Sequence, residues 1–213
     1  MKHPRVLVAD DHQMLAEALR GIIEPRCEVV GTVGDGRALL EAAQRLQPDI
    51  VVLDIAMPHL NGFDAGRKLK HTLLNVKLIF MTMHKDPYLV GEAFRAGASA
   101  FLLKNAAASE LTDAIEQVLK GGSYITPSAK EGLNKISLRD PKNRERVPEP
   151  TLRQREVIQL LAEGRSMKEV ASELKITLRT VAEHKYAVME LLNLTTNADL
   201  VLYAIEHGII SLH

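Results

Sequence analysis

Carboxylates, a hydroxyl and an ammonium directly follow four short apolar runs in the first half of the chain. The runs and the polar residues that end them are 6–9 with Asp10 and Asp11, 50–53 with Asp54, 78–81 with Thr82, and 100–103 with Lys104. Runs this short and rich in β-branched residues are typical of strands buried on both faces of a parallel sheet. The carboxyl ends of such strands form sites in open α/β sheets. We therefore expect these polar side chains to meet at one edge.

The chemistry of such a cluster follows from its residue types. Three converging carboxylates repel one another, and each raises the pKa of the others unless a cation lies among them. Carboxylate oxygens with no histidine or cysteine nearby favour Mg²⁺ over zinc. Mg²⁺ binds phosphoryl oxygens, Thr82 can donate to a second phosphoryl oxygen, and Lys104 can neutralise a third. The cluster thus predicts a phosphoryl site with a carboxylate nucleophile. A structural metal site is the alternative, but it leaves Thr82 and Lys104 unexplained.

Helical patterns separate the apolar runs. Their apolar stripes are Met14, Leu15, Ala18, Leu19 and Ile22; then Leu39, Leu40, Ala43 and Leu46; and last Leu111, Ala114, Ile115, Val118 and Leu119. A weaker strand pattern covers 28–33. Strands that alternate with helices of this length predict a parallel α/β sheet covered on both faces. We expect five strands and about five helices within residues 1–125.

The second half of the chain changes character twice. Residues 126–149 combine prolines with basic residues and few apolar ones after Leu138, which predicts a solvated linker, helical at first and loose later. From residue 150 the pattern is helical, and Thr151, Ser166, Thr177 and Thr196 are candidate N-caps. Gly164, Asn193 and Gly208 are candidate stops. The predicted helices are 152–163, 167–174, 178–192 and 197–207.

Composition limits the function classes. The chain has 213 residues, 46% of them hydrophobic and 25% charged, with a formal net charge of +0, so no global charge bias favours nucleic acid or membrane. The single cysteine, Cys27, excludes an intrachain disulfide and fits a cytosolic protein. We find no signal peptide and no apolar stretch near the ~20 residues of a membrane span. We expect a cytoplasmic protein that does not contact membranes.

The motifs of the first half resemble receiver domains of two-component response regulators, which have a flavodoxin/CheY-like fold. The matching stretches are Asp10-Asp11-His12, Asp54-Ile-Ala-Met-Pro58 with Asn61-Gly62, Thr82, Ala-Gly97-Ala and Phe101-Leu-Leu-Lys104. The resemblance implies that Asp54 accepts a phosphoryl group from a histidine kinase. It also implies that Asp10, Asp11, Asp54 and the carbonyl of Ala56 hold Mg²⁺, and that Thr82 and Lys104 contact the phosphoryl group.

Two further roles depend on the same resemblance. Phe101 would be the aromatic that rotates as a switch, although strand periodicity alone makes it a core residue. Ala56 and His84 occupy positions that vary among receivers and can set the phosphate lifetime; for His84, simple exposure is the alternative. The protein would be a phosphoacceptor with at most slow self-dephosphorylation, not an enzyme.

Residues 150–213 resemble the LuxR/NarL class of helix-turn-helix domains. The residues that carry this resemblance include Thr151, Glu156, Gly164, Val181 and the stretch Ala198-Asp-Leu-Val-Leu-Tyr-Ala204. Pro150, Leu152 and Asn193 depart from the common pattern. Helix 178–192 would be the recognition helix, with Ala182, Glu183 and Tyr186 at base-reading positions. Thr180 would also contact DNA, and Lys168, Arg179, Lys185 and Arg165 are candidates for phosphate contacts.

This second domain carries seven Lys/Arg and eight Asp/Glu in residues 151–213, a net charge of −1. Non-specific attraction to DNA is then modest, and we expect a phosphorylated homodimer to bind double-stranded DNA. Two alternatives stay open. One is a Mg²⁺-dependent phosphohydrolase, which would want an acid where this chain has Ala56. The other is a DNA-binding module whose receiver is vestigial.

Overall fold

The computed structural model describes residues 3–106, 108–130 and 149–210, which fall into two compact units, Met1–Arg139 and Asp140–His213. Each unit is described by itself. Most of the predicted linker, residues 131–148, lies outside the described residues.

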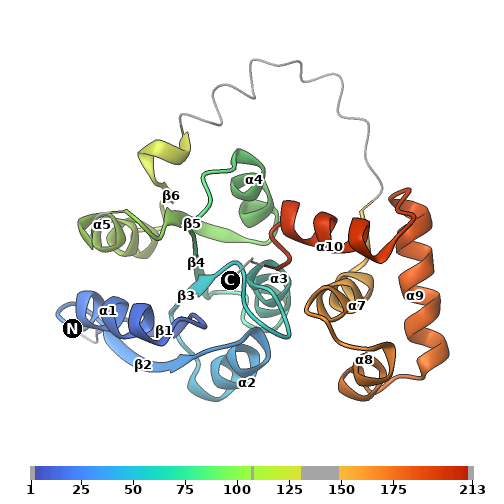
Figure 1. Ribbon diagram of the computed structural model, residues 1–213. Coiled ribbons are helices and arrows are strands. Elements are labelled where there is room, and N and C mark those ends of the chain that lie inside the picture. The colour runs from blue at the N-terminus through green and yellow to red at the C-terminus, as the bar shows by residue number, and fades with distance from the viewer. Residues whose placement is uncertain (1–2, 107, 131–148, 211–213) are drawn as a thin grey trace. The chain divides into compact units, whose positions relative to one another are not determined.

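The first unit is a parallel α/β sheet (Figure 1). Its strands are β1 (Arg5–Ala9), β2 (Glu28–Val33), β3 (Ile50–Asp54), β4 (Lys77–Thr82), β5 (Ala98–Leu103) and β6 (Tyr124–Ile125), in the order β2-β1-β3-β4-β5-β6. All five predicted strands are present. The sixth was not predicted because two residues, paired with Ala100 and Phe101 of β5, are too short to show a period.

Helices cover both faces of this sheet (Figure 1). α1 (Gln13–Ile23) and α5 (Ala108–Leu119) pack against one face, and α2 (Gly36–Leu46), α3 (Gly62–Thr72) and α4 (Pro87–Arg95) pack against the other. The strands between them are buried on both sides, as continuous apolar runs require. The resulting core holds the ends of β1, β3, β4 and β5 in fixed register.

The predicted apolar stripe of α1 is partly wrong. Met14 is 86% exposed, whereas Ala16, Leu19 and Ile23 are buried against the sheet. Leu19 is buried as predicted and Leu15 and Ile22 are half-buried, but the buried face is turned away from Met14 and Ala18 toward Ala16 and Ile23.

The packing of the first unit continues beyond residue 125. The backbone amide of Thr126 donates to the carbonyl of Phe101 at 3.0 Å, and residues 127–130 are helical. Ala129 is buried in the same apolar cluster as Phe101. The early part of the predicted linker therefore packs with the first unit.

The second unit contains α7 (Leu152–Ala162), α8 (Met167–Leu174), α9 (Leu178–Leu191) and α10 (Asn197–Glu206), which agree with the predicted helices within one residue. The predicted caps explain this agreement. Thr151, Ser166 and Thr196 each form a complete capping box, and Thr177 accepts from the amide of Thr180. Gly164, Asn193 and Gly208 take the positive φ that was expected where helices stop.

Helix α7 is central to the second unit. One of its faces packs with α8 and α9 through Val157, Leu160, Val170 and Val181, and the other with α9 and α10 through Ile158, Val188, Leu200 and Ala204. Leu191, the last residue of α9, is 37% exposed. Among the described residues, no helix combines the length and apolar character needed to cross a membrane.

Candidate functional sites

The strand register brings the predicted polar residues of the first unit to one edge. Asp54 pairs with Met81 in β4, and Thr82 pairs with Leu103 in β5. The backbone amide of Lys104 donates to the carbonyl of Thr82 at 2.8 Å, which extends this pairing beyond the strand. Asp54, Thr82 and Lys104 therefore end three neighbouring strands at the same carboxyl edge.

Lys104 provides the positive charge in this cluster. Its Nζ lies 2.8 Å from Oδ2 of Asp10 and 2.8 Å from Oδ2 of Asp54, and all three side chains are almost fully buried. The flanking carboxylates raise the pKa of Lys104 although burial alone would lower it. The ammonium thus stays charged and holds β1, β3 and β5 together at the site.

The electrostatics of Asp54 are those of a carboxylate in an unfavourable environment. Burial raises its pKa from 3.8 to about 6. Lys104 acts in the opposite direction, and Asp10 and Asp11 add to the rise. A carboxylate whose pKa is raised by burial and by like charges gains from a cation, so the site is built to attract one.

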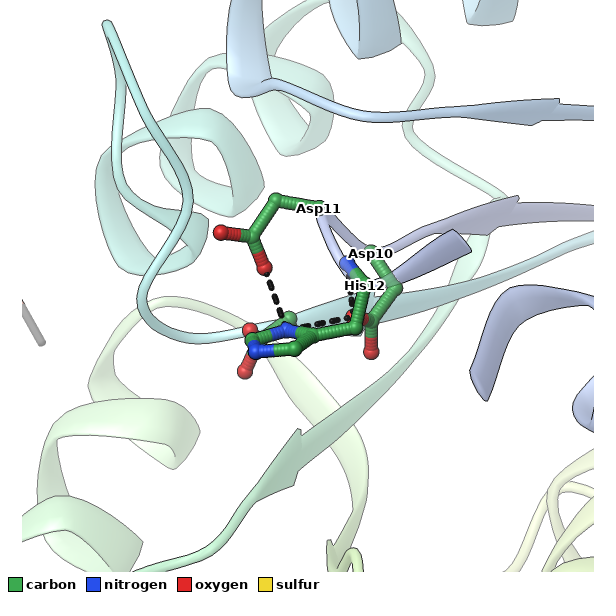
Figure 2. Close-up of side chains that lie close together, drawn as sticks. Asp10, Asp11 and His12 are labelled. Carbon is green, nitrogen blue, oxygen red and sulfur yellow. Dashed lines mark hydrogen bonds and ion pairs between the residues drawn. The ribbon is translucent and has the colours of Figure 1, made fainter. Parts of the chain in front are cut away.

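A histidine lies within the carboxylate cluster, which sequence reasoning missed. Figure 2 shows the ring of His12 turned toward Asp11 and Asp10, and its Nδ1 lies 2.7 Å from Oδ1 of Asp11 and 3.3 Å from Oδ1 of Asp10. The premise that no histidine is near the carboxylates is therefore wrong. The signal was present in the sequence, since His12 directly follows the two aspartates, but a strand pattern does not fix how a loop residue turns.

The donor atoms fit a small divalent cation. One ligand atom from each of Asp10, Asp11, His12 and Asp54 lies within 4.8 Å of all the others. Three carboxylates give hard oxygen ligands of the kind that Mg²⁺ takes, and their charge exceeds that of Lys104. Asp10, Asp11 and Asp54 are therefore the residues whose carboxylates could hold such a cation.

The loop that carries Ala56 is held tightly at both ends. The amide of Gly62 donates to the carbonyl of Ile55 at 2.7 Å, and Asn61 caps α3 through the amide of Asp64. A Cβ at Gly62 would lie 2.1 Å from the carbonyl oxygen of Asp54. The Asn61-Gly62 pair thus lets α3 begin in direct contact with the end of β3.

Thr82, His84 and Phe101 occupy different environments. Thr82 is buried, and its Oγ1 accepts a hydrogen bond from the amide of His84 at 3.1 Å. His84 itself is exposed. Phe101 is fully buried among the apolar side chains of β4, α4 and α3, as strand periodicity predicts.

Half of the predicted DNA-contacting residues on helix α9 of the second unit are exposed to solvent. Arg179, Glu183 and Tyr186 are exposed, and Lys168 is exposed on the preceding helix α8. The remaining predicted contacts are half-buried: Thr180, Ala182 and Lys185 on α9, and Arg165 just before α8. Their common position on α8 and α9 is that of a helix-turn-helix, with Lys175 in the left-handed conformation at the turn.

Two local interactions order this surface. Nε of Arg179 lies 3.0 Å from Oε1 of Glu183, one helical turn away. The ammonium of Lys185 lies 5.3 Å from the centre of the Tyr186 ring. Surface pairs of this kind contribute little stability, but they orient the side chains that form them.

The fold and the acidic site define a class of protein, the response regulators with a receiver domain followed by a helix-turn-helix domain. Comparison with family models agrees: the response regulator receiver domain matches residues 6–116, and the luxR family of bacterial regulatory proteins matches residues 151–204. The chain therefore belongs to the response regulators with a LuxR-type DNA-binding domain.

Individual relatives support the same assignment over the whole length. The transcriptional regulatory protein MctR of Rhizobium johnstonii is 33% identical over 97% of this chain and 95% of its own. The response regulator VraR of Staphylococcus aureus is 30% identical over 97% of this chain and 98% of its own. A structure of RcsB from Salmonella typhimurium shares the fold, with a TM-score of 0.68 and 24% identity over 97% of this chain and 99% of that chain.

Proposed function

We propose that Asp54 is the phosphoacceptor of this response regulator and that a sensor histidine kinase is its donor. The observation that carries the proposal is the buried cluster in which Lys104 bridges Asp10 and Asp54 beside Asp11. A carboxylate oxygen of Asp54 attacks the phosphorus of a phosphohistidine, the P–N bond breaks, and the imidazole of the donor leaves with the electron pair. Asp54 becomes an acyl phosphate.

Three groups of the chain assist this transfer. Lys104 neutralises charge that develops on the phosphoryl oxygens, and Thr82 donates its hydroxyl hydrogen to one of them. Asp10, Asp11, Asp54 and the carbonyl of Ala56 hold Mg²⁺, which supplies charge neutralisation and orientation when it is bound. Because Ala56 offers no acid or base two residues after Asp54, we infer slow self-dephosphorylation and no turnover of external phosphate esters.

Phosphorylation is proposed to act through the residues that line the site. When Thr82 turns toward a phosphoryl oxygen it vacates space beside β4, and Phe101 on the adjacent strand is placed to repack. The population then shifts toward a form that dimerises. Any such shift must overcome the tight packing of Phe101, which is fully buried in this structure.

The second unit is proposed to bind double-stranded DNA with α9 in the major groove. Ala182, Glu183 and Tyr186 would face base edges, while Lys168, Arg179, Thr180 and Lys185 would contact phosphates. RcsB, which shares the fold, has been solved in complex with DNA. Because residues 151–213 carry a net charge of −1, we infer that two copies must bind together for useful affinity.

The phosphoacceptor is tested by incubation with acetyl phosphate and MgCl₂, followed by intact-mass spectrometry. The native chain should gain one phosphoryl group, and Asp54→Asn should gain none. Asp49→Asn is the matched control, because Asp49 lies on the same segment but at the opposite end of β3, and it should still be phosphorylated. Phosphorylation of Asp54→Asn would refute the assignment.

A further inference from the structure

His12 lies at the metal site but has no role in the function proposed above. It is the N-cap residue of α1, yet its side chain makes no capping hydrogen bond. Histidine is also not among the residues that cap helices well. The ring is turned to the carboxylates instead, with Nδ1 2.7 Å from Asp11 and 3.3 Å from Asp10 (Figure 2).

The position of this nitrogen is that of a ligand atom. One ring nitrogen of His12 belongs to a group of four atoms, with one oxygen each from Asp10, Asp11 and Asp54, that lie within 4.8 Å of one another. The ring is about half exposed, 55% by side-chain area, so it forms the solvent side of the cluster, while Asp10 and Asp54 form the buried side. A cation that enters from solvent therefore meets the imidazole and the carboxylates together.

An imidazole changes which cation the site prefers. Mg²⁺ takes oxygen ligands almost exclusively and gives up its waters reluctantly, so it gains little from a nitrogen donor. First-row transition ions bind nitrogen more readily, and their affinity rises from Mn²⁺ onward along the series. Mn²⁺ also accepts carboxylates, so the remaining ligands suit it as well as they suit Mg²⁺.

We propose that His12 is a ligand of the metal site and gives it a preference for Mn²⁺ and related divalent transition ions over Mg²⁺. This inference rests on the metal site of the proposed function and adds one residue and one ion class to it. In the state described here, the imidazole nitrogen pairs with Asp11; on metal binding both turn their donor atoms to the ion.

The test compares two metals and three proteins. Dissociation constants for MnCl₂ and MgCl₂ are measured on the full chain at about pH 8, where a free imidazole is neutral. Free Mn²⁺ is followed by electron paramagnetic resonance, and Mg²⁺ by its displacement of Mn²⁺. The proteins are the native chain, His12→Ala and His71→Ala. His71 is exposed in the last turn of α3 and is the control for loss of a surface histidine.

The expected result is a selective loss. His12→Ala should weaken Mn²⁺ binding by about tenfold, the scale of a lost contact at a metal site. Because oxygen ligands dominate Mg²⁺ binding, its constant should change by less than about twofold. His71→Ala should change neither constant. Equal effects of His12→Ala on both ions, or no effect on either, would overturn the proposal.

A spectroscopic measurement tests the ligand directly. Electron spin-echo modulation of bound Mn²⁺ should show coupling to an imidazole nitrogen in the native chain and in His71→Ala, and none in His12→Ala. If the native chain shows no such coupling, His12 is not a ligand. The proposed function is tested separately by phosphorylation of the native chain with Mg²⁺. Phosphorylation can succeed even if His12 is not a ligand. If phosphorylation fails, the metal-binding measurements still show whether His12 is a ligand.

Discussion

Nζ of Lys104 lies 2.8 Å from a carboxylate oxygen of Asp54, on the strand end where the phosphoryl group would be received. The same nitrogen lies 2.8 Å from Asp10. In the absence of a phosphoryl group, Lys104 thus partly neutralises the acidic site. A metal ion and a phosphoryl group would redistribute these contacts, so stability, metal affinity and phosphorylation should respond together to changes at this edge.

Lys104→Met tests the role of this ammonium. Removing one partner from a buried ion pair leaves the other charge without compensation, which costs about 3 kcal/mol. We expect that loss of unfolding free energy in chelator at about pH 8, where Asp54 is ionised, and a smaller loss at about pH 5, where Asp54 is largely protonated. Mg²⁺ should bind more tightly to the variant, because it no longer competes with an ammonium.

Urea unfolding at the two pH values, with and without MgCl₂, measures these effects. Lys120→Met is the control, because its side chain is exposed at the surface of the same unit. If Lys104→Met has native stability in chelator, the ion pair makes no net contribution to the fold.

Asp54→Asn should make the metal-free protein more stable above pH 6. The folded pKa of about 6 exceeds the value of 3.8 expected for the unfolded chain, mainly because of burial, so folding favours the protonated acid. Ionisation of Asp54 therefore costs the native chain no unfolding free energy below about pH 4 and its full cost above about pH 6. The rise in pKa corresponds to a cost of at most about 3 kcal/mol. The stabilisation by Asn should grow as the pH rises through this window.

Thermal unfolding in chelator from about pH 4 to about pH 8 measures this trend. Asp49→Asn is again the control and should show the same pH trend as the native chain, because Asp49 precedes β3 and lies at the opposite end of the strand from Asp54. Saturating Mg²⁺ should raise the stability of the native chain and have a smaller effect on Asp54→Asn, since ligand binding to the folded state stabilises it. A native chain that gains stability with rising pH across the window would contradict the argument.

Two glycines in helices should respond to alanine in opposite directions. Gly62 begins α3, and an added Cβ there would lie 2.1 Å from the carbonyl oxygen of Asp54, so Gly62→Ala should destabilise the protein by about 2 kcal/mol or more. Gly91, inside α4, has no atom within 4 Å of the same added carbon, and Gly91→Ala should stabilise by about 0.5–1 kcal/mol.

Metal binding separates a local effect of Gly62→Ala from a general one. The clash lies between α3 and the end of β3, so it displaces the loop that carries Ala56. Calorimetric titration should therefore show weaker Mg²⁺ binding in Gly62→Ala at a temperature where it is still folded, and native binding in Gly91→Ala. Native Mg²⁺ affinity in a folded Gly62→Ala variant would mean that this loop does not contribute to the site.

His84→Ala should shorten the life of the aspartyl phosphate. The amide of His84 donates to Oγ1 of Thr82, and this hydrogen bond does not depend on the side chain, so the substitution removes only the exposed imidazole beside the site. Less shielding should admit water and speed hydrolysis several-fold. Intact-mass measurements over time, with His71→Ala as control, give the half-life; an unchanged half-life removes His84 from the mechanism.

The strand ends and helix caps could be predicted from sequence because they depend on local rules. Asp54 ends a continuous apolar run, which predicts the carboxyl edge of the sheet. Thr151 and Ser166 each precede a capping partner by three residues, which predicts where α7 and α8 begin. The convergence of Asp10 and Lys104 also followed, since parallel strands end together.

Other features depend on tertiary packing that no single segment encodes. His12 makes no capping hydrogen bond, and its ring lies against Asp10 and Asp11 instead, a side-chain conformation that the strand pattern does not fix. Ala16 rather than Met14 is buried against the sheet, although both are apolar residues of α1. Sequence periodicity gives the existence of a helix more reliably than the orientation of its face.

Substitutions on α8 and α9 should separate phosphate contacts from base contacts. Lys168→Ala removes one exposed cation, so affinity should fall for all duplexes alike, and the slope of log K against log salt should decrease by about one. Tyr186, 59% exposed on α9, would face base edges, so Tyr186→Ala should weaken binding to a preferred site by about 1–3 kcal/mol and leave non-specific binding unchanged. Fluorescence anisotropy with a duplex selected from random sequences and with a scrambled duplex, at several salt concentrations, distinguishes these effects.

Lys120→Ala, on the receiver surface, is the control. If Tyr186→Ala weakens both duplexes equally, Tyr186 contacts the backbone rather than bases, and the sequence preference must come from Glu183 and Ala182 alone.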